Sequence, residues 1–331
     1  MNYLVTGGAG YIGGTVARLL LNRGHAVTIY DSLCHSRRDA VPESATFVEG
    51  DLNNKEFLIE TLTRTHFDGV FHFAALIEAG ESMKCPDVYF RNNTVGTLSL
   101  LEGMKATGTD KLVFSSTAAC YGEPKRTPIE EDDDLAPTNA YGESKLLSEH
   151  MMRWFGTQLN LRYAALRYFN VAGAIDGYGE QHEPESHLIP LVLDAALGLR
   201  KEIRIFGQDY PTKDGTCVRD YVHVADLAEA HLLAMESLSR QSSAVYNLGN
   251  GQGFTVREVI ESARRVTGRD IPVVEEPRRP GDPAVLVASS DKAKRELGWA
   301  PTFTDLDSII DSAWRWHQTL RERPQQVFQE R

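Results

Sequence analysis

Thr6-Gly7-Gly8-Ala9-Gly10-Tyr11-Ile12-Gly13 joins a short apolar run at Asn2–Thr6 to a helical pattern that starts at Ile12. Gly8, Gly10 and Gly13 satisfy the pattern G-x-G-x-x-G. Such glycines permit a tight turn and let the backbone approach a pyrophosphate, which the free N–H groups of a helix N-terminus can bind. With a strand before it and a helix after it, this stretch predicts a dinucleotide-binding turn.

Short apolar runs alternate with longer helical patterns in the first half of the chain. The expected strands are Asn2–Thr6, Ala26–Tyr30, Ala45–Val48, Gly69–Phe73, Lys111–Phe114 and Arg162–Arg167. The expected helices are Ile12–Arg23, Lys55–Thr65, Pro86–Thr107 and Ala140–Gln158. Because alternating strands and helices form right-handed βαβ units, residues 1–173 predict an α/β fold, a Rossmann-type doubly wound parallel sheet.

The pattern loosens after Gly173, where Asp176–Glu185 is expected to be a loop. Shorter elements follow, and the expected ones are Leu188–Leu199, Glu202–Phe206, Val224–Ser237, Ala244–Leu248 and Val256–Thr267, with further helices near the C-terminus. We expect them to form a smaller C-terminal α/β substrate lobe over residues 174–331. Its boundary is approximate, because the chain can cross between the lobes more than once.

Composition excludes several classes of function. The chain has 331 residues and 35 Lys and Arg against 46 Asp and Glu, a net charge of −11. An acidic protein of this kind is not expected to bind nucleic acid or anionic membranes over a broad surface. Its four cysteines lack metal-ligand and redox spacing, which predicts free thiols, no metal site and a reducing compartment. With no secretory leader and no long apolar run, a cytoplasmic location is expected.

Tyr141-Gly142-Glu143-Ser144-Lys145 is the strongest candidate for catalysis. Residues four apart share one face of a helix, with Cβ atoms roughly 5–6 Å apart. An ammonium beside a phenol favours the phenolate, so Tyr141 is expected to have a lowered pKa and to act as a base. Taken alone, the pair also fits an ordinary surface helix, and only its context argues against that interpretation.

Polar side chains at the ends of the expected strands are candidates for ligand binding, since ligands of open α/β sheets bind there. Asp31 ends the second strand, where a carboxylate accepts from ribose hydroxyls and repels a 2′-phosphate, which favours NAD over NADP. Asp51, before Leu52, is placed to meet an adenine or to cap a loop. Ser115, Ser116 and Thr117 follow the fifth strand as sugar-binding hydroxyls or as an ordinary strand end. His72 and Cys120 are interpreted as buried structural residues.

These residues, in this order, resemble the extended short-chain dehydrogenase/reductases of nucleotide-sugar metabolism. Within that group the chain is similar to the UDP-glucose 4-epimerase family, and the resemblance extends to about Pro301. The segments that carry the closer resemblance are His72–Ala75, Gly80–Ser82, Asn92-Asn93, Arg167–Asn170 and, most specific of all, Asp209–His223.

The resemblance implies an NAD-dependent enzyme that interconverts UDP-galactose and UDP-glucose through a 4-keto sugar, and that forms a homodimer. Tyr141 would take the proton of the sugar 4-hydroxyl, Lys145 would lower the tyrosine pKa and bind the nicotinamide ribose, and Thr117 would hydrogen-bond the 4-oxygen. Whether the cellular task is galactose use or the supply of glycan precursors stays open.

The resemblance also implies the residues of two binding sites. NAD would contact Gly7, Gly10, Tyr11, Ile12, Gly13, Asp31, Asp51, Leu52, Phe73, Ala74, Ala75, Asn92, Ser115, Tyr141, Lys145 and Tyr168. The UDP-hexose would contact Thr117, Tyr141, Phe169, Asn170, His187, Leu188, Phe206, Arg219, Arg279 and Asp282. Arginines suit a diphosphate because their planar fork binds two oxygens. For Arg219, a salt bridge to a neighbour such as Asp220 or Asp226 is the alternative.

The chain departs from the family pattern at some positions, and other functions are alternatives to the epimerase. Some relatives have lysine where this chain has Ile77, which predicts altered cofactor contacts. Leu286 is of intermediate size at a position associated with acceptance of N-acetylated sugars, so that specificity is open. A 4,6-dehydratase would need acid and base side chains where Ala118 and Ala119 stand. A pentose or uronate epimerase, or a non-catalytic NAD-binding regulator of the same fold, stays open.

Overall fold

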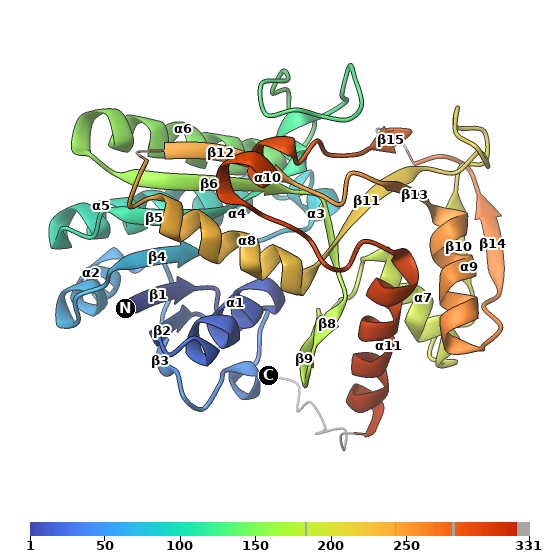
Figure 1. Cartoon of the computed structure of the whole chain (residues 1–331), viewed down its shortest axis with the longest axis horizontal. Coiled ribbons are helices and arrows are strands. Elements are labelled where there is room, and N and C mark those ends of the chain that lie inside the picture. Colours follow the sequence, from blue (N-terminus) through green and yellow to red (C-terminus); the bar gives the residue numbers. More distant parts are fainter. Residues whose placement is uncertain (183, 242, 280–281, 323–331) are drawn as a thin grey trace.

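The computed structural model describes residues 1–182, 184–241, 243–279 and 282–322. Its main layer is a parallel sheet in the order β12-β6-β5-β4-β1-β2-β3 (Figure 1). Its strands are β1 (Asn2–Thr6), β2 (Ala26–Asp31), β3 (Thr46–Glu49), β4 (Gly69–His72), β5 (Lys111–Thr117), β6 (Arg162–Tyr168) and β12 (Ser243–Leu248). The strand order reverses between β1 and β4, which is the switch point of a doubly wound sheet. The predicted Rossmann-type fold is confirmed.

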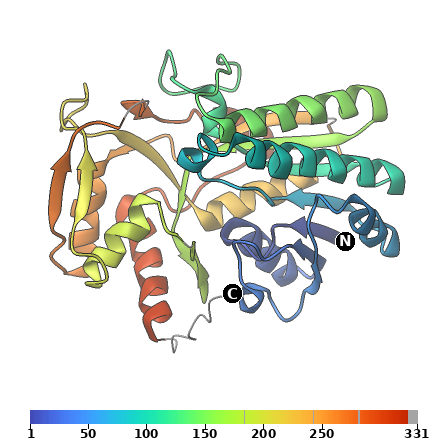
Figure 2. The same ribbon diagram turned by 180° about the vertical axis from the view of Figure 1, so that it is seen from behind.

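Helices cover both faces of this sheet (Figures 1 and 2). On one face lie α1 (Tyr11–Asn22) and α8 (Val224–Ser237), whose apolar side chains share one core cluster with β1, β2 and β12. On the other lie α2 (Lys55–Arg64), α5 (Gly96–Thr107) and α6 (Ala140–Leu159), which share a second cluster with β4 and β5. Two short 3₁₀ turns, η1 (Arg38–Ala40) and η3 (Ala118–Tyr121), follow β2 and β5.

The helix expected at Pro86–Thr107 is not regular. It consists of α4 (Pro86–Tyr89), a π-helical turn η2 (Phe90–Val95) and α5. A π turn inserts an extra residue into the helix and is frequent at functional sites. This one carries Asn92 and Asn93.

The expected assignment of Val224–Ser237 and Ala244–Leu248 to the smaller lobe is wrong. The second segment is β12, which pairs in parallel with β6 from Ser243↔Tyr163 to Leu248↔Tyr168. Tyr246 and Leu248 are fully buried in the main core, and α8 packs beside α1. The chain therefore returns from the smaller lobe to complete the first sheet.

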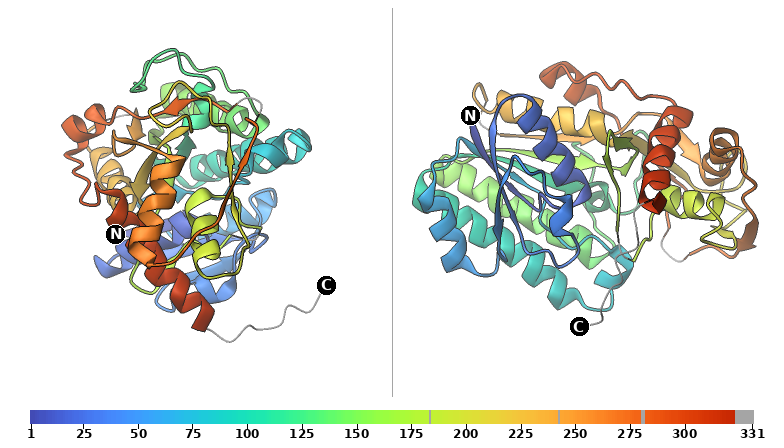
Figure 3. Two further views of the ribbon diagram at one scale, coloured as in Figure 1. Left: turned by 90° about the vertical axis from the view of Figure 1, so that its right-hand side faces the viewer. Right: turned by 90° about the horizontal axis from the view of Figure 1, so that it is seen from below.

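The smaller lobe has its own core between α7 (Leu188–Ala196), α9 (Val256–Thr267) and α11 (Leu306–Glu322) (Figure 3). β10 (Ile203–Phe206) pairs in parallel with β14 (Val273–Glu276). A further sheet joins β7 (Asn170–Ala172), β11 (Val218–His223), β13 (Gly253–Thr255) and β15 (Val285–Leu286). The remaining short helices are α3 (Ala79–Ser82) and α10 (Asp291–Leu297).

The stretch expected to be a loop after Gly173 begins as a β-ribbon. β8 (Ala174–Ile175) pairs antiparallel with β9 (Tyr178–Gly179) around Gly177, whose φ of +72° suits a tight turn.

Among the described residues, no helix combines the length and the apolar character that a membrane span requires.

Candidate active site

The glycine-rich turn leaves a cradle at the N-terminus of α1. A Cβ on Gly13 would lie 2.3 Å from the carbonyl oxygen of Gly7, and Gly7 itself has φ +70° with a Cβ position 2.5 Å from the Ala74 nitrogen. At Gly10 a Cβ would meet only one atom, at 3.4 Å. Helix α1 has no side-chain cap and no acidic residue in its first turn, so its N–H groups remain available to an anion. The turn therefore fits a dinucleotide pyrophosphate, with Tyr11 and Ile12 at its edge.

Asp31 closes the other side of this cradle. Its buried carboxylate accepts hydrogen bonds from the Ala9 nitrogen at 3.0 Å, the Leu33 nitrogen at 2.9 Å and the Ser36 hydroxyl at 2.8 Å. It thus holds the glycine-rich turn and lies where a ribose is expected. The nearby Arg37 forms an ion pair with Asp39.

Beyond the carboxyl ends of β2 and β3 lies a hollow of about 640 Å³. Its lining includes Ser32, Asp51, Leu76 and Asn92. Asp51 accepts from the Asn53 nitrogen at 2.8 Å, as a loop cap does, while it also faces the hollow. Both roles considered for Asp51 are therefore compatible with its position. The volume suits the adenosine end of a dinucleotide.

The other cofactor candidates border these two features. Leu52 is buried, and Phe73, Ala74 and Ala75 directly follow β4, where the Phe73 nitrogen donates to the Thr6 carbonyl at 2.9 Å. His72 is fully buried and hydrogen-bonds Thr6 at 2.7 Å and Thr97 at 2.9 Å, which confirms its structural role. Burial also raises the pKa of the Cys120 thiol to about 12, as expected for a structural cysteine.

Helix α6 presents Tyr141 and Lys145 to the end of β5. Its first turn is held by the Asn139 side chain, which accepts from the Gly142 nitrogen at 2.8 Å. A Cβ on Gly142 would come within 2.7 Å of the Ala119 carbonyl oxygen, so glycine lets the helix approach η3 closely. Lys145, 2% exposed, donates from Nζ to the Ser115 carbonyl oxygen at 2.9 Å.

The electrostatics of the pair differ from the expectation. Burial raises the pKa of Tyr141 to about 12, and a hydrogen bond with Thr117 offsets only part of that rise. Burial also lowers the pKa of Lys145 to about 7. The predicted lowering of the Tyr141 pKa by Lys145 is therefore wrong for the protein without ligands, because the ammonium is itself desolvated and bonded to a carbonyl.

Because Lys145 is buried, we expect the free energy of unfolding to rise with pH. The folded pKa is about 7, whereas that of an unfolded lysine is about 10.4. Between these values the unfolded chain binds a proton that the folded chain does not, so the free energy of unfolding rises by up to about 1.4 kcal/mol per pH unit. Urea unfolding of nucleotide-free wild type and Lys145→Met, from pH 7 to 10, measures this slope. Identical slopes would contradict the buried, neutralised lysine.

One residue that positions the pair, Asn93, was missed as a site candidate. Asn93, in the π turn, donates to the Leu76 carbonyl at 3.0 Å and to the Ser144 hydroxyl at 3.0 Å, while accepting from the Leu76 nitrogen at 2.8 Å. It ties the loop after β4 to α6. On the neighbouring strand, the hydroxyls of Ser115 and Tyr168 share a short hydrogen bond. The consecutive asparagines were the available signal in the sequence.

Four of the candidate substrate-binding residues contact one another in two pairs. Arg219, on β11, forms an ion pair with Asp282, so the alternative pairing with Asp220 or Asp226 is not the one observed. The Arg279 guanidinium lies 3.8 Å from the centre of the Phe206 ring. The first contact lies on β11, where Leu286 is the register neighbour of Arg219, and Phe206 of the second ends β10.

The remaining substrate candidates lie where the two lobes meet. Asn170 begins β7 opposite Tyr221 of β11, and the Phe169 nitrogen donates to the Leu248 carbonyl at 3.3 Å. His187 is the N-cap of α7, and Leu188 is its first residue.

The chain is similar to known proteins over most of its length. The NAD dependent epimerase/dehydratase family matches residues 3–249. The chain is 50% identical to a UDP-glucose 4-epimerase of Lacticaseibacillus casei over 325 residues, which are 97% of this chain and 98% of that one. The structure of a UDP-glucose 4-epimerase from Brucella ovis in complex with NAD has a TM-score of 0.92 at 45% identity, covering 95% of this chain and 97% of that one.

A second solved relative, UDP-glucose 4-epimerase from Bifidobacterium longum in complex with NAD⁺ and UDP, has a TM-score of 0.91 at 36% identity. It covers 96% of this chain and 98% of that one. The match of the family model over most of the chain and the identity to these relatives agree with the geometry described above. The chain therefore belongs to the NAD dependent epimerase/dehydratase family.

Proposed function

We propose that this enzyme is a UDP-glucose 4-epimerase, which interconverts UDP-galactose and UDP-glucose through a transient 4-keto sugar with NAD as its cofactor. The observation that carries the proposal is the meeting of Tyr141 and Lys145 with the hydroxyl end of β5, at the same edge of the parallel sheet as the glycine-rich turn. The relatives of about 50% identity that bear this name support it.

Tyr141 is the acid–base residue of this proposal. Bound NAD would supply a reversible hydride acceptor for the sugar carbon. Tyr141 takes the proton of the 4-hydroxyl and gives it back, so one group serves both directions. Thr117 already hydrogen-bonds the Tyr141 hydroxyl and would bind the same sugar oxygen. Lys145 is fixed by Ser115 where it can donate to a nicotinamide ribose.

The high pKa of Tyr141 has a consequence for this mechanism. At a pKa of about 12, the phenol holds its proton at neutral pH. A positive charge beside it, from the bound cofactor or from protonated Lys145, favours the phenolate. We infer that the base becomes active only in the assembled complex.

The NAD site is assigned to the turn at Gly7, Gly10 and Gly13, to Asp31 for the adenosine ribose, and to the hollow beside Asp51 for the base. These features fit the cofactor in shape and in hydrogen-bonding capacity. The remaining cofactor residues of this proposal are Tyr11, Ile12, Leu52, Phe73, Ala74, Ala75, Asn92, Ser115, Tyr141, Lys145 and Tyr168. Ile77, which is 37% exposed, offers no ammonium to the nicotinamide.

Replacing Asp31 by asparagine is expected to relax the preference for NAD. The change keeps an oxygen acceptor but removes the charge that repels a 2′-phosphate. We expect the ratio of dissociation constants for NADP and NAD to fall at least about tenfold, or about 1.4 kcal/mol. Asp39→Asn, a nearby exposed carboxylate paired with Arg37, is the matched control. An unchanged ratio in Asp31→Asn would remove this residue from its role.

The UDP-sugar is assigned to the smaller lobe. Arg219, Arg279 and Asn170 would bind the diphosphate, and Asp282 would accept from the uridine ribose after releasing Arg219. The existing Arg219–Asp282 ion pair supports this, because it holds both groups side by side at the edge of β11. Phe169, Phe206, His187 and Leu188 would border the sugar and the uridine. Leu286, beside Arg219, leaves acceptance of N-acetylated sugars open.

The decisive assay adds UDP-galactose to the purified enzyme and measures UDP-glucose. Interconversion is expected, with no elimination product, because Ala118 and Ala119 in η3 cannot transfer protons. UDP-N-acetylglucosamine, a UDP-pentose and a UDP-uronate in the same assay decide between the epimerase specificities. Bound NAD without interconversion of any of these sugars would favour the non-catalytic regulator instead.

We further propose a homodimer in the cytoplasm that acts in galactose metabolism, with a cofactor domain at 1–173 and a UDP-sugar domain at 174–331 to which α8 and β12 are the exceptions. A dimer is supported by exposed apolar side chains on neighbouring helices, Val95 of η2 at 46% and Trp154 of α6 at 61% exposure. Patches of this kind mark interaction surfaces.

A further inference from the structure

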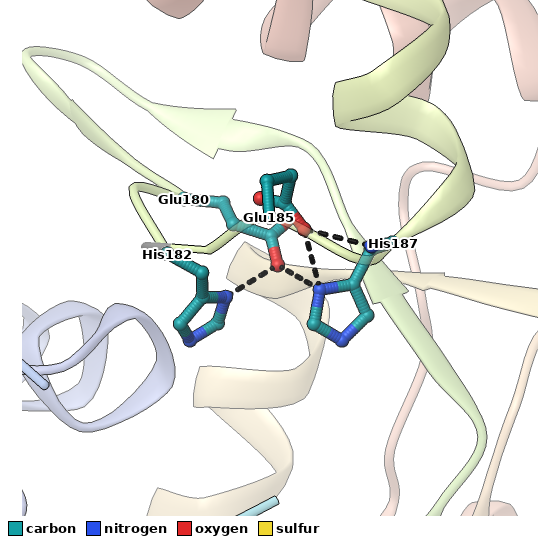
Figure 4. A group of neighbouring side chains, drawn as sticks. All are labelled: Glu180, His182, Glu185 and His187. Carbon is teal, nitrogen blue, oxygen red and sulfur yellow. Dashed lines mark hydrogen bonds and ion pairs between the residues drawn. The ribbon is translucent and has the colours of Figure 1, made fainter. Parts of the chain in front are cut away.

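Four side chains with metal-ligating atoms cluster between β9 and α7. Glu180, His182, Glu185 and His187 each offer one such atom, and these atoms all lie within 4.8 Å of one another. Figure 4 shows the Glu180 carboxylate between the two imidazoles, with Glu185 facing His187. In the part of the chain that the structure describes, no other group of three or more His, Cys, Asp or Glu meets this condition.

The spacing of these atoms is close to that of a metal site. Nδ1 of His182 and of His187 lie 2.9 Å and 3.0 Å from Oε1 of Glu180, and His187 Nδ1 lies 2.9 Å from Oε1 of Glu185. A tetrahedral zinc ion with bonds of about 2.0–2.2 Å spaces its ligands roughly 3.3–3.6 Å apart. Shifts of a few tenths of an ångström would bring these three pairs to that spacing, and the other pairs of ligand atoms lie within 4.8 Å.

The charge and the burial of these four side chains also favour a bound cation. The side chains of Glu180 and Glu185 are only 7% and 15% exposed. Metal ligation requires neutral imidazoles. The two carboxylates then carry a charge of −2, which a divalent cation neutralises, and a mixed nitrogen and oxygen set suits zinc. We propose that Glu180, His182, Glu185 and His187 are the ligands of a binding site for a divalent transition-metal ion, and that this ion is zinc.

The backbone around the cluster holds the ligands in place. The Glu185 carboxylate accepts from the nitrogens of Ser186 at 2.8 Å and of His187 at 2.7 Å. The Glu180 carbonyl accepts from the Trp316 indole at 2.8 Å, which anchors this end of the segment to α11. Such outer contacts orient ligands and tune the affinity of a metal site.

The site would connect the two lobes. Tyr178, two residues before Glu180, donates to the Gly10 carbonyl in the glycine-rich turn at 2.8 Å. His187 is the N-cap of α7, at the proposed substrate end. An ion bound to Nδ1 would fix this segment from both sides and leave Nε2 of His187 for a substrate phosphate. The assignment does not depend on the proposed reaction.

Metal binding tests the site directly. Chelator-treated full-length protein is titrated with Zn²⁺ in competition with a chromophoric chelator, and with Co²⁺ monitored by its visible absorption. We expect one ion per chain and intense tetrahedral Co²⁺ bands. His182→Ala, which lies outside the proposed substrate contacts, should bind at least about tenfold more weakly. His150→Ala, a matched change of an exposed histidine on α6, should bind as wild type does.

Three results would overturn the site. They are no stoichiometric binding to wild type, equal binding by His182→Ala and wild type, or a Co²⁺ spectrum without tetrahedral bands. Equal binding would indicate adventitious ligands such as the exposed thiol of Cys34. If circular dichroism shows that His182→Ala is unfolded, Glu185→Ala takes its place in the comparison. The wild-type Co²⁺ spectrum decides in either case.

Discussion

Tyr141→Phe is expected to lower kcat by at least about 10³-fold while NAD still binds. The variant keeps the ring and loses only the hydroxyl that exchanges a proton with the sugar, and positioned acid–base groups contribute about 10²–10⁴-fold. Thr117 cannot replace it, because an alcohol is a far weaker acid than a phenol. Since substrate affinity depends on other contacts, KM should change much less than kcat. Steady-state kinetics with UDP-galactose and a titration with NAD measure both.

A matched control separates this effect from a loss of packing. Tyr163, on β6, is 8% exposed in the core cluster on the other side of the sheet from α1. Tyr163→Phe makes the same chemical change and should retain nearly full activity. Near-normal turnover of Tyr141→Phe would exclude Tyr141 as the acid–base residue. Loss of NAD binding in Tyr141→Phe would instead indicate a structural role.

The chemistry of the pair shows how far residue spacing can predict a site. Tyr141 and Lys145 were predicted to share a helix face, and α6 carries them both to the end of β5. The direction of the Tyr141 pKa was predicted wrongly. Desolvation sets that pKa, and burial depends on packing between residues far apart in the sequence.

The fold shows the same division between local and long-range information. The glycine-rich turn and the alternation of strands and helices predict the doubly wound sheet. They do not predict that β12 joins β6, because the apolar pattern of a strand is the same in either sheet. The buried contacts of Tyr246 and Leu248 decide the matter, and they form only when the chain returns from the smaller lobe.

The cluster of possible metal ligands between β9 and α7 is not predicted from the sequence. The spacing of the cysteines predicts no metal site, whereas the cluster is built of glutamate and histidine at positions 180, 182, 185 and 187. Charged residues two or three apart in a segment expected to be a loop usually face solvent. The β-ribbon and Trp316 turn this segment inward, which no local pattern indicates.

The largest effect on stability is expected from Glu149→Gln. Glu149 on α6 forms a buried ion pair with Arg167 on β6 at 2.5 Å, with side chains 6% and 4% exposed. Its Oε1 also accepts from the Ser116 hydroxyl at 2.5 Å. The variant leaves the Arg167 charge buried without a counter-charge, and breaking a buried pair in this way costs about 3–5 kcal/mol. Urea unfolding of wild type and variant measures the difference.

Two further variants separate the burial of charge from the loss of an ion pair as such. Glu60→Gln breaks the exposed pair with Arg64, whose side chains are 53% and 66% exposed, and should cost less than about 1 kcal/mol. The double change Glu149→Leu with Arg167→Met removes both buried charges and should recover part of the loss, because the stranded charge is the main penalty. Equal costs for Glu149→Gln and Glu60→Gln would contradict this argument. The hydroxyl end of β5 would then be held at the active site by packing, and not by the Ser116–Glu149–Arg167 contacts.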